Sequence, residues 1–81
     1  MTENELRALL DETTDPLARQ YVAAELMRLE AGRLERIAGY LIERGHAAEG
    51  ASDLARARMH TAQADSIQRR LLAKVNGNGH A

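Results

Sequence analysis

The sequence of 81 residues contains no cysteine, phenylalanine or tryptophan, and it has only two tyrosines and one proline. Without cysteine, the chain cannot be stabilised by disulfides or by a thiolate zinc site. No uncharged run approaches the roughly 20 residues that a membrane-spanning helix needs. The acidic first five residues also lack the apolar segment of a secretory signal. We therefore expect no membrane partner and a cytoplasmic location.

The apolar residues that are present are mainly alanine and leucine, with 15 and 11 copies. Alanine and leucine favour helices, whereas the β-branched and aromatic residues that favour strands are scarce. A chain of this length has one domain as the usual expectation. The sequence therefore predicts an all-α protein in which residues 1–81 form a single helical domain.

A short helix is expected near the N-terminus. Thr2 and Glu5 have the spacing of a capping box, in which each side chain hydrogen bonds to the backbone of the other residue. Leu6, Leu9 and Leu10 then form a narrow apolar stripe over residues 3–11. A helix of this length is not stable alone in water, so it must either dock or fray.

Two long helices follow. Asp15 before Pro16 is a favourable N-cap, because proline is preferred at the first helical position. Gly45 suits the position just after the end of that helix, and Ser52 is the expected N-cap of the next one. The sequence predicts helices at 16–44 and 52–75, a turn at 45–50 and a flexible tail at 76–81. Together they form a long antiparallel hairpin with a short N-terminal helix.

The large apolar side chains of the first long helix fall in one wide sector, which indicates contact with more than one neighbouring helix. The second long helix has small residues in its first half and large ones in its second half. A lone hairpin buries too little apolar surface to offset the ordering of its residues. We therefore expect a homodimer that completes a four-helix bundle with coiled-coil packing, or docking on a larger protein. The predicted interface residues are Val22, Leu26, Leu29, Leu34, Ile37, Tyr40, Leu41, Ile67 and Leu71.

The charges are unevenly distributed, with a net charge of −4 over residues 1–50 and +3 over residues 51–81. The two long helices are therefore expected to attract each other when they lie side by side, and Asp65 is spaced to pair with Arg69. Glu30 and Arg33 interrupt the apolar sector. They either form a pair, within the helix or across an interface, or they mark the edge of the buried face.

No pattern of residues indicates catalysis or a cofactor. Glu43 and His46 have the spacing of di-iron bundles, but the second helix offers no glutamate to complete such a site. The three histidines are 14 and 20 residues apart, and no nucleophile arrangement or phosphate-binding loop is visible. We expect no catalytic residues, no metal and no cofactor, and hence no enzyme.

The leading hypothesis is a non-catalytic interaction protein that acts through helix packing with itself or with a larger partner. An alternative is a small regulator associated with nucleic acid, because the second long helix is basic. A further alternative is a structural component of a virion or an enzyme complex. The residues that would contact nucleic acid are Arg56, Arg69, Arg70 and Lys74.

Overall fold

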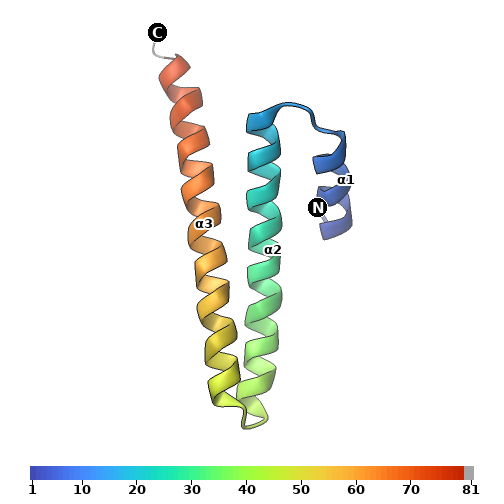
Figure 1. The fold of residues 1–81 in the computed structure, drawn as a ribbon, viewed down its shortest axis with the longest axis vertical. Helices are drawn as coiled ribbons and strands as arrows, with labels where there is room; N and C mark the ends of the chain where they lie inside the picture. Colours follow the sequence, from blue (N-terminus) through green and yellow to red (C-terminus); the bar gives the residue numbers. More distant parts are fainter. Residues whose placement is uncertain (80–81) are drawn as a thin grey trace.

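The computed structural model describes the backbone of residues 1–79 and the side chains of residues 1–75. These residues form three α-helices and no strand: α1 at Glu3–Glu12, α2 at Pro16–Glu43 and α3 at Ala47–Gly79. Helices α2 and α3 form a long antiparallel hairpin, and α1 lies beside the first half of α2 (Figure 1). The predicted all-α hairpin with a short N-terminal helix is confirmed.

The predicted caps of α1 and α2 are present. The Glu5 amide donates to Thr2 Oγ1 at 3.2 Å, and the Thr2 amide donates to Glu5 Oε1 at 3.2 Å, so the capping box is complete. Hydrogen bonding to the Thr2 side chain, and then to the Thr2 backbone amide, lowers the pKa of the Glu5 carboxyl. Asp15 accepts from the amide of Ala18 at 3.2 Å, as expected for an N-cap before Pro16.

The turn between α2 and α3 is shorter than the predicted segment 45–50. Gly45 has a φ of 88°, a conformation that favours glycine. Its amide donates to the carbonyl of Ile42 at 3.1 Å, and the amide of His46 donates to the carbonyl of Leu41 at 2.8 Å. These two bonds form a Schellman motif, which confirms the predicted role of Gly45 and ends α2 within three residues of the start of α3.

The predicted start of the second long helix at residue 52 was wrong. Helix α3 begins at Ala47, and the amide of Gly50 already donates to the carbonyl of His46 at 3.0 Å. Gly50 lies within the helix, where a Cβ would be only 2.9 Å from the carbonyl oxygen of Ala38. Glycine is therefore needed there for the close approach of the two helices rather than for a turn, and Ser52 caps nothing.

The predicted tail at 76–81 was also wrong for its first part. Helix α3 continues to Gly79, so the backbone of 76–79 is helical despite its glycine and asparagine content. The last two residues of the predicted tail, 80–81, lie outside the described residues.

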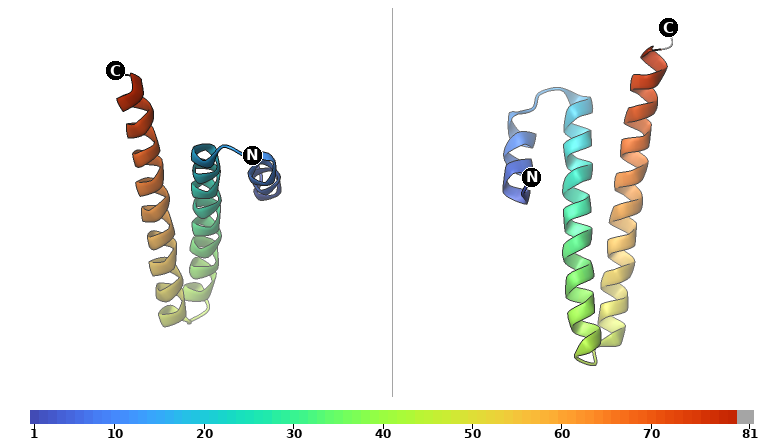
Figure 2. Two further views of the ribbon diagram at one scale, coloured as in Figure 1. Left: turned by 45° about the horizontal axis from the view of Figure 1, so that its top comes forward. Right: turned by 180° about the vertical axis from the view of Figure 1, so that it is seen from behind.

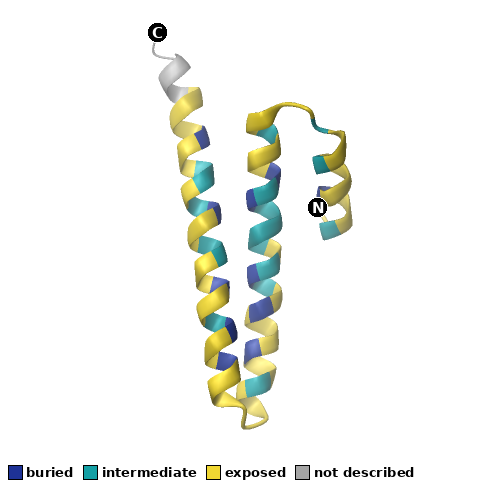
Figure 3. Cartoon of the chain, viewed as in Figure 1, coloured by how far each residue is buried: buried dark blue, intermediate teal, exposed yellow. Residues whose placement is uncertain are grey.

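Small residues line the contact between α2 and α3. Seven residues are almost two helical turns, so residues at this spacing lie on the same side of a helix. The helices meet closely near the turn and diverge toward the start of α2 (Figures 1 and 2). The buried residues face each other along this contact (Figure 3). The members at seven-residue spacing are Ala24, Ala31 and Ala38 in α2, and Gly50, Ala57, Ala64 and Leu71 in α3.

Helix α1 docks on α2 and does not contact α3 within the described residues. Leu6 is buried. Arg19 of α2 donates to the carbonyls of Leu10 and Thr13 at 2.6 and 3.0 Å, which satisfies the C-terminal end of α1. Arg33 of α2 forms an ion pair with Glu3 at the other end. Because α1 contacts only α2, the hairpin is not closed into a three-helix bundle.

The molecule is correspondingly extended. Its radius of gyration is 15.8 Å, whereas a compact domain of this length has about 12 Å. Among the described side chains, no large one is fully buried, and the residues with no exposed surface are alanines. The contact between the helices therefore rests on close backbone approach near the turn, and large apolar side chains remain at the surface.

Candidate helix-packing surface

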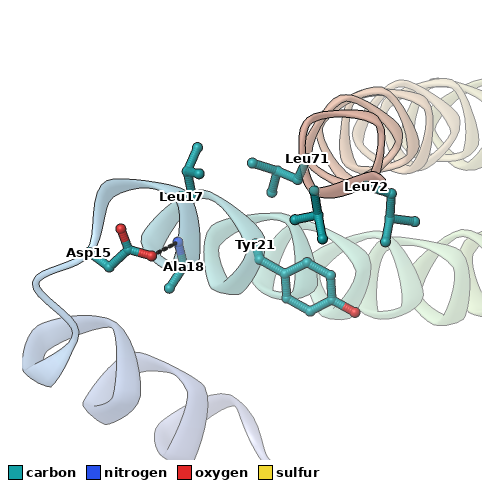
Figure 4. A pocket seen from close by; sticks show the side chains of 7 residues that line it. Asp15, Leu17, Ala18, Tyr21, Leu71 and Leu72 are labelled. Carbon is teal, nitrogen blue, oxygen red and sulfur yellow. Dashed lines mark hydrogen bonds between the residues drawn. The ribbon is translucent and has the colours of Figure 1, made fainter. Parts of the chain in front are cut away.

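A continuous apolar surface extends over all three helices at the end of the hairpin that lies away from the turn. One groove between α1 and α2 contains Leu9, Tyr21 and Leu29. A second groove between α2 and α3 contains Leu17, Tyr21, Leu72 and Val75 (Figure 4). Tyr21 belongs to both grooves and joins them. We call the six exposed residues the Tyr21 surface: Leu9, Leu17, Tyr21, Leu29, Leu72 and Val75.

The helical spacing explains why these side chains gather there. Leu17 and Tyr21 are four residues apart in α2, so they lie on the same side of that helix. The helices have diverged at this level, so Leu71 and Leu72 of α3 do not close the space in front of Tyr21 (Figure 4). Tyr21 remains 46% exposed and Leu72 remains 58% exposed.

A polar network joins α2 and α3 beside the Tyr21 surface. Arg28 donates to Asp65 Oδ1 at 2.6 Å and to Gln68 Oε1 at 2.5 Å. The Gln68 amide in turn donates to Glu25 Oε1 at 2.7 Å. These partly buried polar groups therefore have hydrogen-bond partners within the chain. Glu25 and Arg28 also line the groove between α1 and α2, so the network borders the Tyr21 surface within that groove.

This network corrects two expectations from the sequence. Asp65 pairs across the helices with Arg28 and not along the helix with Arg69. The cross-helix ion pair thus has its base on α2 and its acid on α3, which is the reverse of the predicted attraction between an acidic and a basic helix. Both Glu25 and Arg28 of α2 are turned toward α3, where Glu25 accepts from the Gln68 amide and Arg28 pairs with the Asp65 carboxylate.

Glu30 and Arg33 form the pair that their spacing suggested. Arg33 Nη1 lies 3.0 Å from Glu30 Oε2 within α2, and the same guanidinium also contacts Glu3 of α1. Of the possibilities that the sequence left open, the structure shows pairing within the helix. The charged residues on the apolar sector therefore hold α1 in place.

The predicted interface residues are divided among three environments. Leu34 and Leu71 are buried at the contact between α2 and α3, and Val22 is buried on the side of α1. These three are core residues of the described chain. The large residues are displaced to the flanks because alanines occupy the centre of the contact on α2. Val22, Leu34 and Leu71 are buried; Leu26, Leu41 and Ile67 are half-buried; Leu29, Ile37 and Tyr40 are exposed.

Of that predicted set, Leu29 alone belongs to the Tyr21 surface. Ile37 lies elsewhere, 43% exposed, and Tyr40 is stacked under the guanidinium of Arg44 at 4.6 Å from the ring centre. Leu17, Tyr21 and Leu72 were not among the interface residues predicted from the sequence. The signal that could have found them is the seven-residue repeat of small residues, which fixes the orientation of both helices and leaves these three beside the contact.

The basic residues of α3 do not share one surface. Arg56 forms an ion pair with Asp53 within the helix. Arg70 lies at a groove with Met27 and Ile67, away from the Tyr21 surface. Arg69 and Lys74 are exposed, and Arg69 lies one turn from Leu72. The four residues of the nucleic-acid alternative are thus spread around the helix.

The histidines and acids do not form a metal site in the part of the chain with described side chains. No three of the His, Asp and Glu residues come together there as metal ligands. His46 and Glu43 are both exposed beside the turn. His60 is half-buried, and its Nδ1 atom is buried without a hydrogen-bond partner. It lies at a groove with Leu26 and Met27.

Comparisons with known proteins give no match: no family model, no curated protein and no solved structure is similar to the chain. In the described part of the chain, no helix is both long enough and apolar enough to cross a bilayer.

Proposed function

We propose that this chain is a non-catalytic helical assembly protein, and that its Tyr21 surface packs against a second copy of the same chain. The observation that supports the proposal is the continuity of exposed large side chains across three helices, while no large described side chain is fully buried. A monomer rarely leaves such a connected apolar patch in contact with water.

The energetics support association. Full burial of a leucine or a similar side chain contributes about 1.5–3 kcal/mol relative to exposure. Leu17, Tyr21 and Leu72 keep more than a third of their surface exposed, so much of this contribution is not realised within one chain. A second copy that covers the Tyr21 surface buries these side chains and so supplies the missing free energy of burial. Two hairpins then place their four long helices in one bundle, with each α1 at its margin.

A matched pair of substitutions tests the proposal by sedimentation equilibrium. The wild-type chain is expected to be a dimer at micromolar concentration. Leu72→Glu places a charge in the surface and is expected to weaken the dimer by at least tenfold. Met59→Glu is the control, because Met59 is also in α3 and is similarly exposed, at 55% against 58%, but lines none of the four grooves.

Two results would contradict the proposal. One is a wild-type chain that remains a stable monomer at all concentrations tested. The other is an equal loss of association in both variants, which would show a general effect of added charge. The chain could also be monomeric alone and bind a larger protein in a manner that Leu72→Glu weakens. In that case, the function is still helix packing, but the partner is the larger protein and not a second copy.

A further inference from the structure

The three helices differ in net charge in the order in which they lie. Residues 1–15, which include α1, have five acids and one arginine, a net charge of −4. Residues 16–43, which form α2, have four acids and four arginines and are neutral. Residues 44–81 have a net charge of +3. Because α1 and α3 do not contact each other in the part of the chain that the structure describes, the acidic and basic margins are not paired there within one chain.

These opposite charges border the Tyr21 surface. Glu5 and Glu12 are four residues before and three residues after Leu9, so they share its side of α1. Arg69 is three residues before Leu72 and shares its side of α3. The nearby Asp65 is already paired with Arg28. The Tyr21 surface is therefore bordered by two glutamates on α1 and by Arg69 on α3, while Asp15 at the start of α2 lines the groove between α2 and α3.

Two arrangements of a twofold dimer through this surface differ in how they join the charges. If the axis lies across the helices, α1 faces α1 of the other copy and α3 faces α3, so like charges meet. If the axis runs parallel to α2, α1 of each copy faces α3 of the other, and opposite charges meet twice by symmetry. Like charges in contact disfavour an arrangement, and complementary ones fix its register.

We propose that the two copies are related by a twofold axis parallel to α2, with acidic α1 of each copy lying over basic α3 of its partner. This inference rests on the proposed self-association. In this arrangement, Glu12 of one copy forms an ion pair with Arg69 of the other copy. The axis also brings the two Tyr21 surfaces directly together, because it does not change the level of a residue along the helices.

The register of the chain agrees with this pairing. The bonds from Arg19 to the carbonyls of Leu10 and Thr13 place the end of α1 level with the first turns of α2. The groove that joins Tyr21 with Leu72 places the second half of α3 at the same level. Glu12 and Arg69 therefore lie near one level, on opposite margins of the same surface.

The available area is sufficient. A standard interface removes about 800 Å² from each partner, and the chain has 5819 Å² of accessible surface. Coverage of about one seventh of this surface on each copy therefore reaches the standard size.

Charge reversal tests the axis. Glu12→Arg and Arg69→Glu are each expected to weaken the dimer roughly three- to tenfold, since an exposed pair contributes little and symmetry counts it twice. The double variant is expected to recover the wild-type dissociation constant within about twofold. Arg70→Glu is the control, because Arg70 lies at a different groove, with Met27 and Ile67. It is expected to change the dissociation constant by less than twofold.

The outcomes separate the two proposals. A wild-type dimer that is weakened by Leu72→Glu but is unaffected by either charge reversal overturns the parallel axis and leaves self-association intact. Additive losses in the double variant, without recovery, also overturn it. A mass that grows beyond the dimer with concentration indicates head-to-tail contact between acidic and basic margins, which overturns the closed twofold arrangement.

Discussion

The two ends of the contact between α2 and α3 are built in different ways. Near the turn, Ala31, Ala38 and Ala57 are almost completely buried and the backbones approach closely. At the other end, Leu71 is buried, but Tyr21 and Leu72 beside it are largely exposed. The same pair of helices is thus a closed contact at one end and an open one at the other.

The difference shows how side-chain size determines where a hairpin is self-sufficient. Small residues allow the helix backbones to come together, so that each alanine is covered completely by its neighbours. Large residues hold the helices apart, and a single opposite helix cannot cover their sides. The closed end therefore stabilises the chain, and the open end is available for a partner.

The largest predicted effect tests the closed end. Leu34→Ala is expected to lower the free energy of unfolding by about 2–5 kcal/mol, because Leu34 is only 8% exposed and packs with Ala31 and Ala57. Ile37→Ala, in the same helix but 43% exposed, is expected to cost less than about 1 kcal/mol. Urea denaturation at fixed protein concentration measures both. Equal losses would show that the buried side of α2 is wrongly assigned.

A second prediction concerns the close approach at the turn. Gly50→Ala is expected to destabilise the chain by about 1–3 kcal/mol, since its Cβ would be 2.6 Å from Ile42 Cγ1 and 2.9 Å from the Ala38 carbonyl oxygen. Gly39→Ala is the control, because nothing lies within 4 Å of its added Cβ. That change is expected to stabilise the helix by up to about 1 kcal/mol. Thermal unfolding followed by circular dichroism distinguishes the two, and a stabilising Gly50→Ala would contradict the closed contact.

A third prediction lies between the two ends, at His60. His60→Leu is expected to raise the free energy of unfolding by about 1 kcal/mol, because the change removes a buried Nδ1 atom that has no hydrogen-bond partner. His46→Leu, at the exposed turn, is expected to change stability little. Denaturant titrations of both variants provide the measurement. A loss of stability in His60→Leu would indicate that the imidazole makes a contact that leucine cannot replace.

The smallest predicted effect concerns the N-terminus of α1, which lies beside the middle of α2 through the ion pair of Glu3 with Arg33. The hydrogen bonds from Thr2 lower the pKa of Glu5, so this contribution to stability is complete above the ordinary pKa of 4.5 and is lost as the pH falls through the lower, folded value. The protection factors of the α1 amides are expected to fall over that acidic range, with those of α3 near the turn unchanged. Thr2→Ala is expected to reduce the shift in an NMR titration of Glu5, because it removes the side-chain hydrogen bond and keeps the backbone one. An unchanged titration in that variant would assign the shift to another cause.

Much of the fold could be predicted from local signals. The capping box at Thr2, the Asp15–Pro16 start and the Gly45 end each depend on residues close in the sequence, and all three are present. The start of α3 could not be predicted in this way. Gly50 has the local character of a turn residue, but its conformation is determined by the approach of Ala38 from the other helix.

The candidate surface was harder to predict for a related reason. The predicted apolar sector of the first long helix included Ile37 and did not include Ala24 and Ala31, which occupy the helix contact. Alanine contributes little hydrophobic area, so its role is visible only in its spacing. Once α2 is oriented by its alanines, the exposure of Tyr21 follows from helical geometry.

The three-residue turn has a consequence for the order in which the chain folds. Contacts close to the turn join residues that are near in the sequence, such as Ala38 and Gly50, so closing that loop costs little entropy. The groove lined by Leu17 and Leu72 joins residues that are most of the chain apart. We expect the hairpin to form from the turn outward, so that the Tyr21 surface is the last part to become ordered and is completed when its partner binds.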